Sequence, residues 1–84
     1  MFYYVYMLKN ICQNKKKTYV GYTNNLHKRL RKHNSNVGAK STRGYKWMII
    51  FKKKFLSKSI AMSYEYNLKK DRKKRLKILK EFNC

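Results

Sequence analysis

The sequence predicts a small α/β (α+β) fold: a three-stranded antiparallel sheet flanked by helices, in the order ββαβαα. The chain has 84 residues, 43% hydrophobic and 15% aromatic, which is enough apolar material for one compact core. Segments rich in β-branched and aromatic residues alternate with segments whose apolar residues recur every three or four positions. No proline, repeat or linker interrupts the sequence, so we expect one domain over residues 1–84.

The strands are expected at residues 2–8, 18–22 and 45–55, where aromatic and β-branched side chains predominate. A polar, basic stretch separates the first two, which predicts an antiparallel hairpin with a basic tip. The third segment is apolar on both faces at its centre. We therefore expect that both faces of this strand are covered there.

The first helix is expected between the second and third strands. Thr23 or Asn24 can cap it, and it should run to about His33. The small, polar residues that follow, including Gly38 and Gly44, predict a loop.

Two more helices are expected after the third strand. One begins at Ser57 or Ser59 and runs to about Lys70. Asp71 can cap the last helix, whose apolar residues recur at a helical interval: Leu76, Leu79 and Phe82.

The composition points to a polyanionic partner. There are 23 lysines and arginines against three acids, a formal charge of +20, and such self-repulsion is best offset by binding nucleic acid. Because the chain is also rich in Asn, Ile and Tyr, a biased coding composition explains part of the lysine excess. The five arginines are therefore the more informative cations.

Several functional classes lack their signatures in this sequence. There is no P-loop, Ser/His/Asp set, nucleophilic Cys/His pair or dinucleotide fingerprint. Three acids, Glu65, Asp71 and Glu81, are too few for the carboxylate cluster of a typical two-metal nuclease. Cys12 and Cys84 lack metal-site spacing, so we expect free thiols and assign them no role. Without a secretory leader or a membrane span, we expect an intracellular, non-secreted protein with no membrane partner.

Two charged residues lie on helix faces that should be apolar. Arg29 belongs to the inward stripe of the first helix, and Glu65 to that of the second. The stripes follow i, i+3, i+4, i+7 spacing: Leu26, Arg29, Leu30 and His33; Ala61, Tyr64, Glu65 and Leu68. Spacing leaves two explanations open. In the first, Arg29 and Glu65 have a structural role: they pair with each other, or their charged ends reach the solvent-exposed rim. In the second, they form a phosphate site in which Arg29 binds the phosphate and Glu65 holds a divalent metal.

Tyrosines in the first two strands add to this pattern. Tyr4 and Tyr6 share one face of the first strand, and Tyr19 in the neighbouring strand can lie beside them. Gly21 allows a close approach to the backbone there. Most of the eight tyrosines are expected to be ordinary packing residues, so this adjacency is the informative feature.

These residues resemble the GIY-YIG nuclease superfamily over nearly the whole chain. The resemblance is carried by Tyr4-Val5-Tyr6, by Tyr19-Val20-Gly21, by Arg29 eight residues later and by Glu65 on a later helix. HNSNVGAKSTRGYKW at 33–47 is further similar to the short stand-alone branch related to the catalytic domain of structure-specific branch nucleases. The first triplet departs from the family pattern, because Tyr4 stands where the family has glycine.

The resemblance implies a phosphodiesterase site. Tyr6 and Tyr19 would surround the attacking water, Arg29 would steady the phosphate, and Glu65 would bind one Mg²⁺ or Mn²⁺ ion. It leaves open which tyrosine acts as the base. His33 is either a phosphate donor or a plain helix-end histidine. The residues expected to contact nucleic acid are Gly21, Arg31, Lys40 and Arg43, although Arg43 also fits a solvated loop charge.

The leading hypothesis is a metal-dependent DNA endonuclease that leaves 5′-phosphate and 3′-hydroxyl ends. We expect it to be directed by DNA structure rather than sequence and to act in DNA repair or recombination. The alternatives are a non-catalytic nucleic-acid binder on the same fold and a structural or partner-docking protein. The sequence leaves open whether the DNA is branched, flapped or nicked, and whether a partner protein or a homodimer selects the site.

Overall fold

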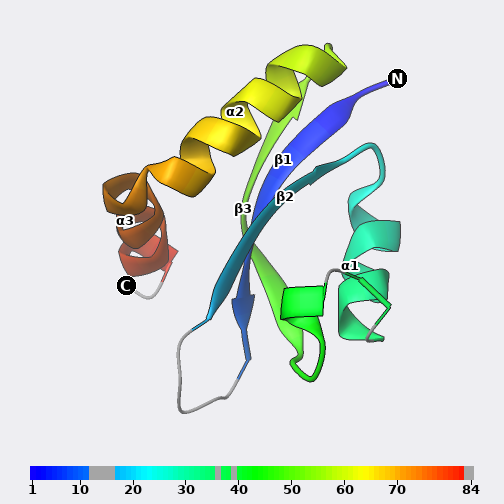
Figure 1. The fold of residues 1–84 in the computed structure, drawn as a ribbon, viewed down its shortest axis with the longest axis vertical. Coiled ribbons are helices and arrows are strands. Elements are labelled where there is room, and N and C mark those ends of the chain that lie inside the picture. The colour runs from blue at the N-terminus through cyan, green and yellow to red at the C-terminus, as the bar shows by residue number, and fades with distance from the viewer. Residues whose placement is uncertain (12–16, 36, 39, 83–84) are drawn as a thin grey trace.

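A computed structural model describes residues 1–11, 17–35, 37, 38 and 40–82, and it confirms the predicted α+β class (Figure 1). Three antiparallel strands form one sheet in the order β2-β1-β3. The elements are β1 (Tyr3–Asn10), β2 (Thr18–Thr23), α1 (Leu26–Asn34), a 3₁₀ turn (Lys40–Thr42), β3 (Trp47–Phe55), α2 (Lys58–Lys70) and α3 (Arg72–Phe82). Both cysteines and most of the predicted basic hairpin tip lie outside the described residues.

The N-terminal cap of α1 differs from the prediction. Asn25 is the cap, and its side-chain oxygen accepts a hydrogen bond from the Lys28 N–H at 3.1 Å. Thr23 instead accepts from the Asn25 N–H at 3.1 Å and so shapes the turn before the helix. The prediction of Thr23 or Asn24 was wrong by one or two residues because a run of possible caps carries no local signal that selects one.

The caps of the other two helices follow the prediction. Ser57 caps α2, with its side-chain oxygen accepting from the Ile60 N–H. Asp71 accepts from the Lys74 N–H at 3.1 Å at the start of α3.

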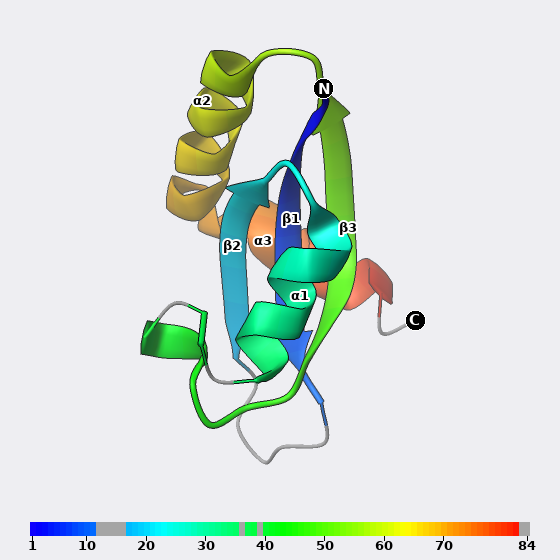
Figure 2. The same cartoon turned by 90° about the vertical axis from the view of Figure 1, so that its right-hand side faces the viewer.

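The helices cover opposite faces of the sheet. Figures 1 and 2 show α1 on one face and α2 with α3 on the other. Side chains alternate along β1, so Val5 and Met7 face α2, whereas Tyr6 and Leu8 face α1. In the described part of the chain, no helix combines the length and the apolar character that crossing a membrane requires.

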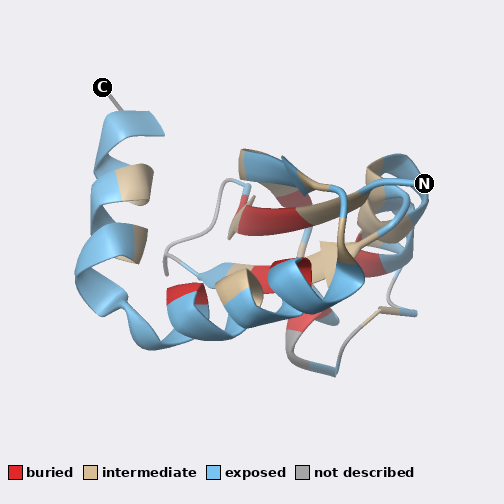
Figure 3. Ribbon diagram, turned by 90° about the horizontal axis from the view of Figure 1, so that it is seen from above, coloured by how far each residue is buried: buried red, intermediate tan, exposed pale blue. Residues whose placement is uncertain are grey.

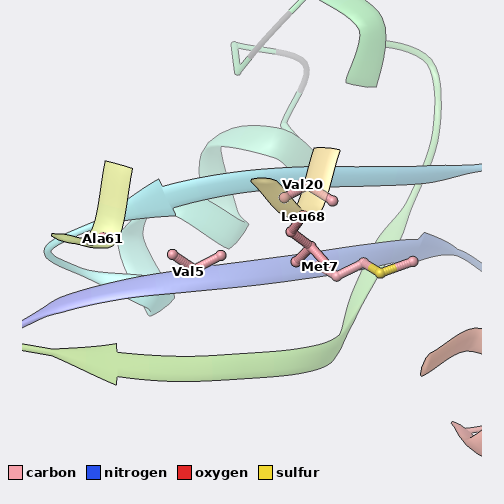
Figure 4. Packing of buried hydrophobic residues seen from close by; sticks show 5 residues of the cluster. All are labelled: Val5, Met7, Val20, Ala61 and Leu68. Atoms are coloured by element: carbon pink, nitrogen blue, oxygen red, sulfur yellow. The ribbon is translucent and has the colours of Figure 1, made fainter. Parts of the chain in front are cut away.

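Each face of the sheet has its own apolar cluster. Under α2, Val5 and Met7 pack with residues of β2 and α2: Val20, Ala61 and Leu68 (Figure 4). Under α1, Tyr6, Leu8 and Trp47 are buried, and Leu26 and Leu30 pack against them. The burial pattern in Figure 3 places the fully buried residues mainly on the strands, while α3 has none.

The strand register sets the neighbours of Tyr6. Tyr6 lies opposite Gly21 in the β1–β2 pair, and Leu8 lies opposite Tyr19. Tyr6 and Tyr19 are therefore diagonal neighbours on the face that α1 covers. The adjacency of these two tyrosines is the feature that the sequence pattern predicted.

Candidate active site

The hydroxyl of Tyr6 is the centre of a buried polar cluster. Tyr6 is 1% exposed, and its Oη lies 2.9 Å from Nε2 of His33, which is itself fully buried. Arg29 Nε donates a hydrogen bond to the same oxygen at 3.4 Å. Tyr6 therefore connects β1 to two residues of α1, Arg29 and His33.

The local sequence explains this placement. Leu26 and Leu30 anchor α1 on the sheet, and Arg29 and His33 share the inward side of the helix with them. Arg29 is half-buried rather than enclosed: its Nε contacts the cluster, and the residue is also part of the lining of a hollow. That hollow, of about 170 Å³, is also lined by Lys28 and Lys32, and its cations favour an anion there.

Tyr19 and Gly21 bring the second strand into the site. The Tyr19 ring centroid lies 4.9 Å from that of His33 and 6.4 Å from that of Tyr6. A Cβ at position 21 would lie 2.6 Å from the Tyr6 hydroxyl, which is too close for any side chain. Gly21 therefore makes room for Tyr6, and its predicted contact with nucleic acid stays a prediction.

The protonation states follow from burial and neighbouring charge. Burial raises the pKa of Tyr6 to about 12, against the hydrogen bond from Arg29, which lowers it. The hydrogen bond to Tyr6 raises the pKa of Arg29. Burial, and then the charge of Arg29, lowers the pKa of His33. At neutral pH the cluster therefore contains a neutral phenol, a charged guanidinium and a neutral imidazole.

Glu65 reaches the site from α2, and its partner differs from one of the two predicted explanations. Its carboxylate forms an ion pair with Lys69 at 3.8 Å, one helical turn away. Within the described residues no ion pair joins Glu65 to Arg29, so the pairing explanation was wrong. The residues around these two positions pack on different faces of the sheet: Leu26 and Leu30 of α1 against the cluster of Tyr6, and Ala61 and Leu68 of α2 in the cluster of Val5. The negative charge of Glu65 still contributes to the raised pKa of Tyr6.

The donor set near Glu65 suits a hard cation that keeps most of its water. Among the described residues there is no group of three or more His, Cys, Asp or Glu side chains that could hold a metal. The Glu65 side chain is 17% exposed, so it remains open to a hydrated ion. One carboxylate, with waters and a substrate phosphate, is a coordination pattern that Mg²⁺ accepts and that structural Zn²⁺ does not.

His33 has both ring nitrogens engaged within the protein. Nε2 bonds the Tyr6 hydroxyl, and Nδ1 lies 2.9 Å from Oγ1 of Thr42. A fully buried imidazole with two such partners presents no N–H to a phosphate. Of the two roles that the sequence left open for His33, this geometry favours a supporting residue at the end of the helix over a direct contact with phosphate.

The other predicted nucleic-acid residues lie outside this cluster. Arg31, Lys40 and Arg43 are exposed, and no described contact links them to Tyr6. The ion pair between Lys69 and Glu65 was not predicted, although opposite charges four residues apart on a helix commonly pair. Lys69 also lies 6.0 Å from the centre of the Tyr19 ring. Thr42 was missed as well, because the sequence predicts only a loop there and the three-residue 3₁₀ turn that forms is too short for a periodicity that would identify inward residues.

Comparisons with known proteins agree with the geometry. A family model described as the GIY-YIG catalytic domain matches residues 2–78. A UPF0213 protein of Oceanobacillus iheyensis is 46% identical over 68 residues, covering 80% of this chain and 76% of that protein. A UPF0213 protein of Staphylococcus haemolyticus is 37% identical over 81 residues, covering 94% and 95%. The solution NMR structure of a UPF0213 protein from Bacillus halodurans has a TM-score of 0.53 and 34% identity, covering 95% of this chain and 84% of that one.

Proposed function

The chain belongs to the GIY-YIG catalytic domain family, and from this premise we propose that it is a metal-dependent DNA endonuclease. The family indicates a nuclease with DNA as its substrate. We further propose that residues 1–84 act as a single nuclease domain, directed by DNA structure and working in repair or recombination. The observation that carries the proposal is the cluster itself, in which an arginine that belongs to the lining of a cationic hollow bonds a buried phenol beside a second tyrosine.

Arg29 is the proposed phosphate ligand. Its Nε is held by Tyr6, and a hydrogen bond with Tyr19 also contributes to its raised pKa, which leaves the remaining N–H groups of the guanidinium as donors. A planar fork of this kind matches two phosphate oxygens, and it meets the negative charge that develops on them in the transition state. Lys28 and Lys32 line the same hollow and add attraction for the DNA backbone.

The two tyrosines have different environments, and we assign them different roles. Tyr6 is buried, its pKa is about 12 and its hydroxyl is bonded on two sides, so it stays protonated and holds Arg29. Tyr19 is only half-buried. We therefore propose that Tyr19 is the general base: its phenolate would orient the attacking water and take up one proton from it to become the neutral phenol.

Glu65 is the proposed ligand of one Mg²⁺ or Mn²⁺ ion. The ion would replace the Lys69 ammonium, whose exposed, long contact with the carboxylate is weak. When bound, such an ion supplies a Lewis acid at the phosphate and stabilises the leaving oxygen. Lys69 lies near Tyr19, with its Nζ 6.0 Å from the centre of the ring.

One assay tests the function as a whole. The protein is incubated with labelled duplex, nicked, flap and four-way-junction DNA in the presence of Mg²⁺, Mn²⁺ or EDTA. We expect cleavage with either metal and none with EDTA, and a preference among DNA structures. Tight DNA binding without cleavage under every condition would favour the non-catalytic binder instead. Sedimentation of the same sample tests for a homodimer.

Substituting the two tyrosines separately tests their roles. We expect Tyr19→Phe to slow cleavage about 10²-fold, the low end of the range for a general base, because a bound metal ion would also activate the attacking water. Tyr6→Phe should also slow cleavage, because Tyr6 holds Arg29, but unlike Tyr19→Phe it should destabilise the fold by about 1 to 3 kcal/mol, since it removes the shared partner of Arg29 and His33. Single-turnover cleavage and thermal melting of both variants make the comparison. The assignment is wrong if Tyr19→Phe cuts at the wild-type rate.

The salt dependence of binding tests the role of the cationic surface. With a formal charge of +20, DNA affinity should fall linearly on logarithmic axes as salt rises. The loss should be about 10³-fold or more between about 50 and 200 mM salt if six or more phosphates are contacted. Replacing Arg31, Lys40 or Arg43 by alanine should each reduce the slope by roughly one. A flat dependence would contradict this picture.

A further inference from the structure

A chain of hydrogen bonds runs from Trp47 and the buried Thr42, the last residue of the 3₁₀ turn, to the proposed phosphate ligand Arg29. Trp47 Nε1 donates to the backbone carbonyl of Thr42 at 2.9 Å, and the Thr42 hydroxyl lies 2.9 Å from His33 Nδ1. His33 Nε2 contacts Tyr6, which accepts from Arg29. The first four of these residues are at most 2% exposed, so water does not replace their partners.

The Tyr6 hydroxyl determines the direction of these bonds. A phenol has one proton to donate and two lone pairs to accept with. Arg29 carries donors only, so it occupies a lone pair. Within the described residues, His33 Nε2 is the remaining partner, and it must accept the Tyr6 proton if that buried proton is to be satisfied.

Because Nε2 must accept a hydrogen bond, the protonation state and the tautomer of His33 follow. If Nε2 accepts, the imidazole is neutral and carries its proton on Nδ1. That N–H then donates to Oγ1 of Thr42. The opposite tautomer would direct an N–H at a hydroxyl that already accepts from Arg29, and the Tyr6 proton would lose its acceptor.

We infer that Thr42 is a positioning residue: its hydroxyl accepts the Nδ1–H that the Tyr6 bond requires of His33, and it thereby stabilises this tautomer and, through Tyr6, the position of the Arg29 guanidinium. This inference rests on the proposed function, because Arg29 matters as the phosphate ligand. Two features hold the geometry in place. Trp47 secures the Thr42 backbone, and Gly38 packs against His33, where a Cβ would lie 2.7 Å from Nδ1.

The experiment compares three variants with the wild type. Thr42→Val removes the hydroxyl while keeping the shape, Thr42→Ser keeps the hydroxyl, and Trp47→Phe loosens the same loop but leaves Oγ1 in place. For each protein, NMR of the imidazole nitrogens identifies the His33 tautomer. The protection of the Arg29 Nε–H against solvent exchange reports whether Tyr6 still holds the guanidinium. Thermal melting and single-turnover cleavage are measured on the same samples.

We expect the Nδ1–H tautomer in the wild type, Thr42→Ser and Trp47→Phe. Thr42→Val should shift His33 toward the Nε2–H tautomer, expose the Arg29 Nε–H to exchange and slow cleavage about tenfold, the effect of one lost hydrogen bond. An Nε2–H tautomer in the wild type would overturn the inference, and this result does not depend on the folding of any variant. The wild-type tautomer in Thr42→Val would overturn it too.

Failure of the proposed function looks different from failure of this inference. If the wild type cuts no DNA with any metal, the nuclease proposal falls, whereas the tautomer and the Arg29 protection are still measured and still test Thr42. If the wild type cuts DNA and Thr42→Val keeps both NMR signals, the inference about Thr42 falls and the nuclease proposal stands.

Discussion

Glu65→Gln is expected to reduce metal-dependent cleavage by about 10³-fold or more, the largest loss among the substitutions considered for this chain. Glutamine keeps the size and hydrogen bonding of the side chain but removes the negative charge that a hard divalent cation requires. DNA binding should hold or tighten in the absence of metal, because a negative charge near the bound phosphate is gone. Single-turnover cleavage across a Mg²⁺ titration measures the loss.

The melting temperature separates a metal ligand from a structural carboxylate. The contact of Glu65 with Lys69 is a partly exposed i, i+4 ion pair, so its loss should change stability little. Glu81→Gln is the matched control, because it removes another carboxylate from an exposed position of α3 and should cut DNA normally. A Glu65→Gln protein that folds normally and still cuts DNA with Mg²⁺ would refute the assignment of Glu65.

Arg29→Ala should cost about 10²- to 10³-fold in cleavage, the range seen when one donor to a developing transition-state charge is removed. The loss should appear in the rate of the chemical step more than in DNA affinity, since many other cations contribute to binding. The substitution also leaves the Tyr6 hydroxyl with one partner, His33, so a small drop in melting temperature is expected. Rapid-quench kinetics at saturating protein measure the chemical step.

Arg31→Ala provides the comparison for Arg29. It removes the same charge two positions away, on the exposed side of α1, and should change cleavage far less. Both variants should weaken DNA binding to a similar, modest extent. Equal losses of cleavage at the two positions would contradict the assignment of Arg29 as the phosphate ligand and would indicate that it only adds to the general electrostatic attraction of DNA.

The sequence by itself determined which side chains face inward and which elements carry them. The periods of strands and helices are local properties, so alternation placed Tyr6 and Tyr19 on one face, and helical spacing placed Arg29, His33 and Glu65 inward. The family resemblance came from the same short-range patterns, and the match to residues 2–78 confirmed it. Neither kind of evidence identified the partner of any inward charge.

Only the tertiary structure decided those partners. Arg29 bonds Tyr6, and Glu65 forms an ion pair with Lys69, although spacing alone also allowed Arg29 and Glu65 to pair with each other. His33 is paired with Thr42, the last residue of the 3₁₀ turn. Distances between elements depend on how the whole chain packs, and no local period encodes them. For that reason the charged residues of the site could be predicted from the sequence, whereas the hydrogen-bond and ion-pair partners of these residues depend on the fold.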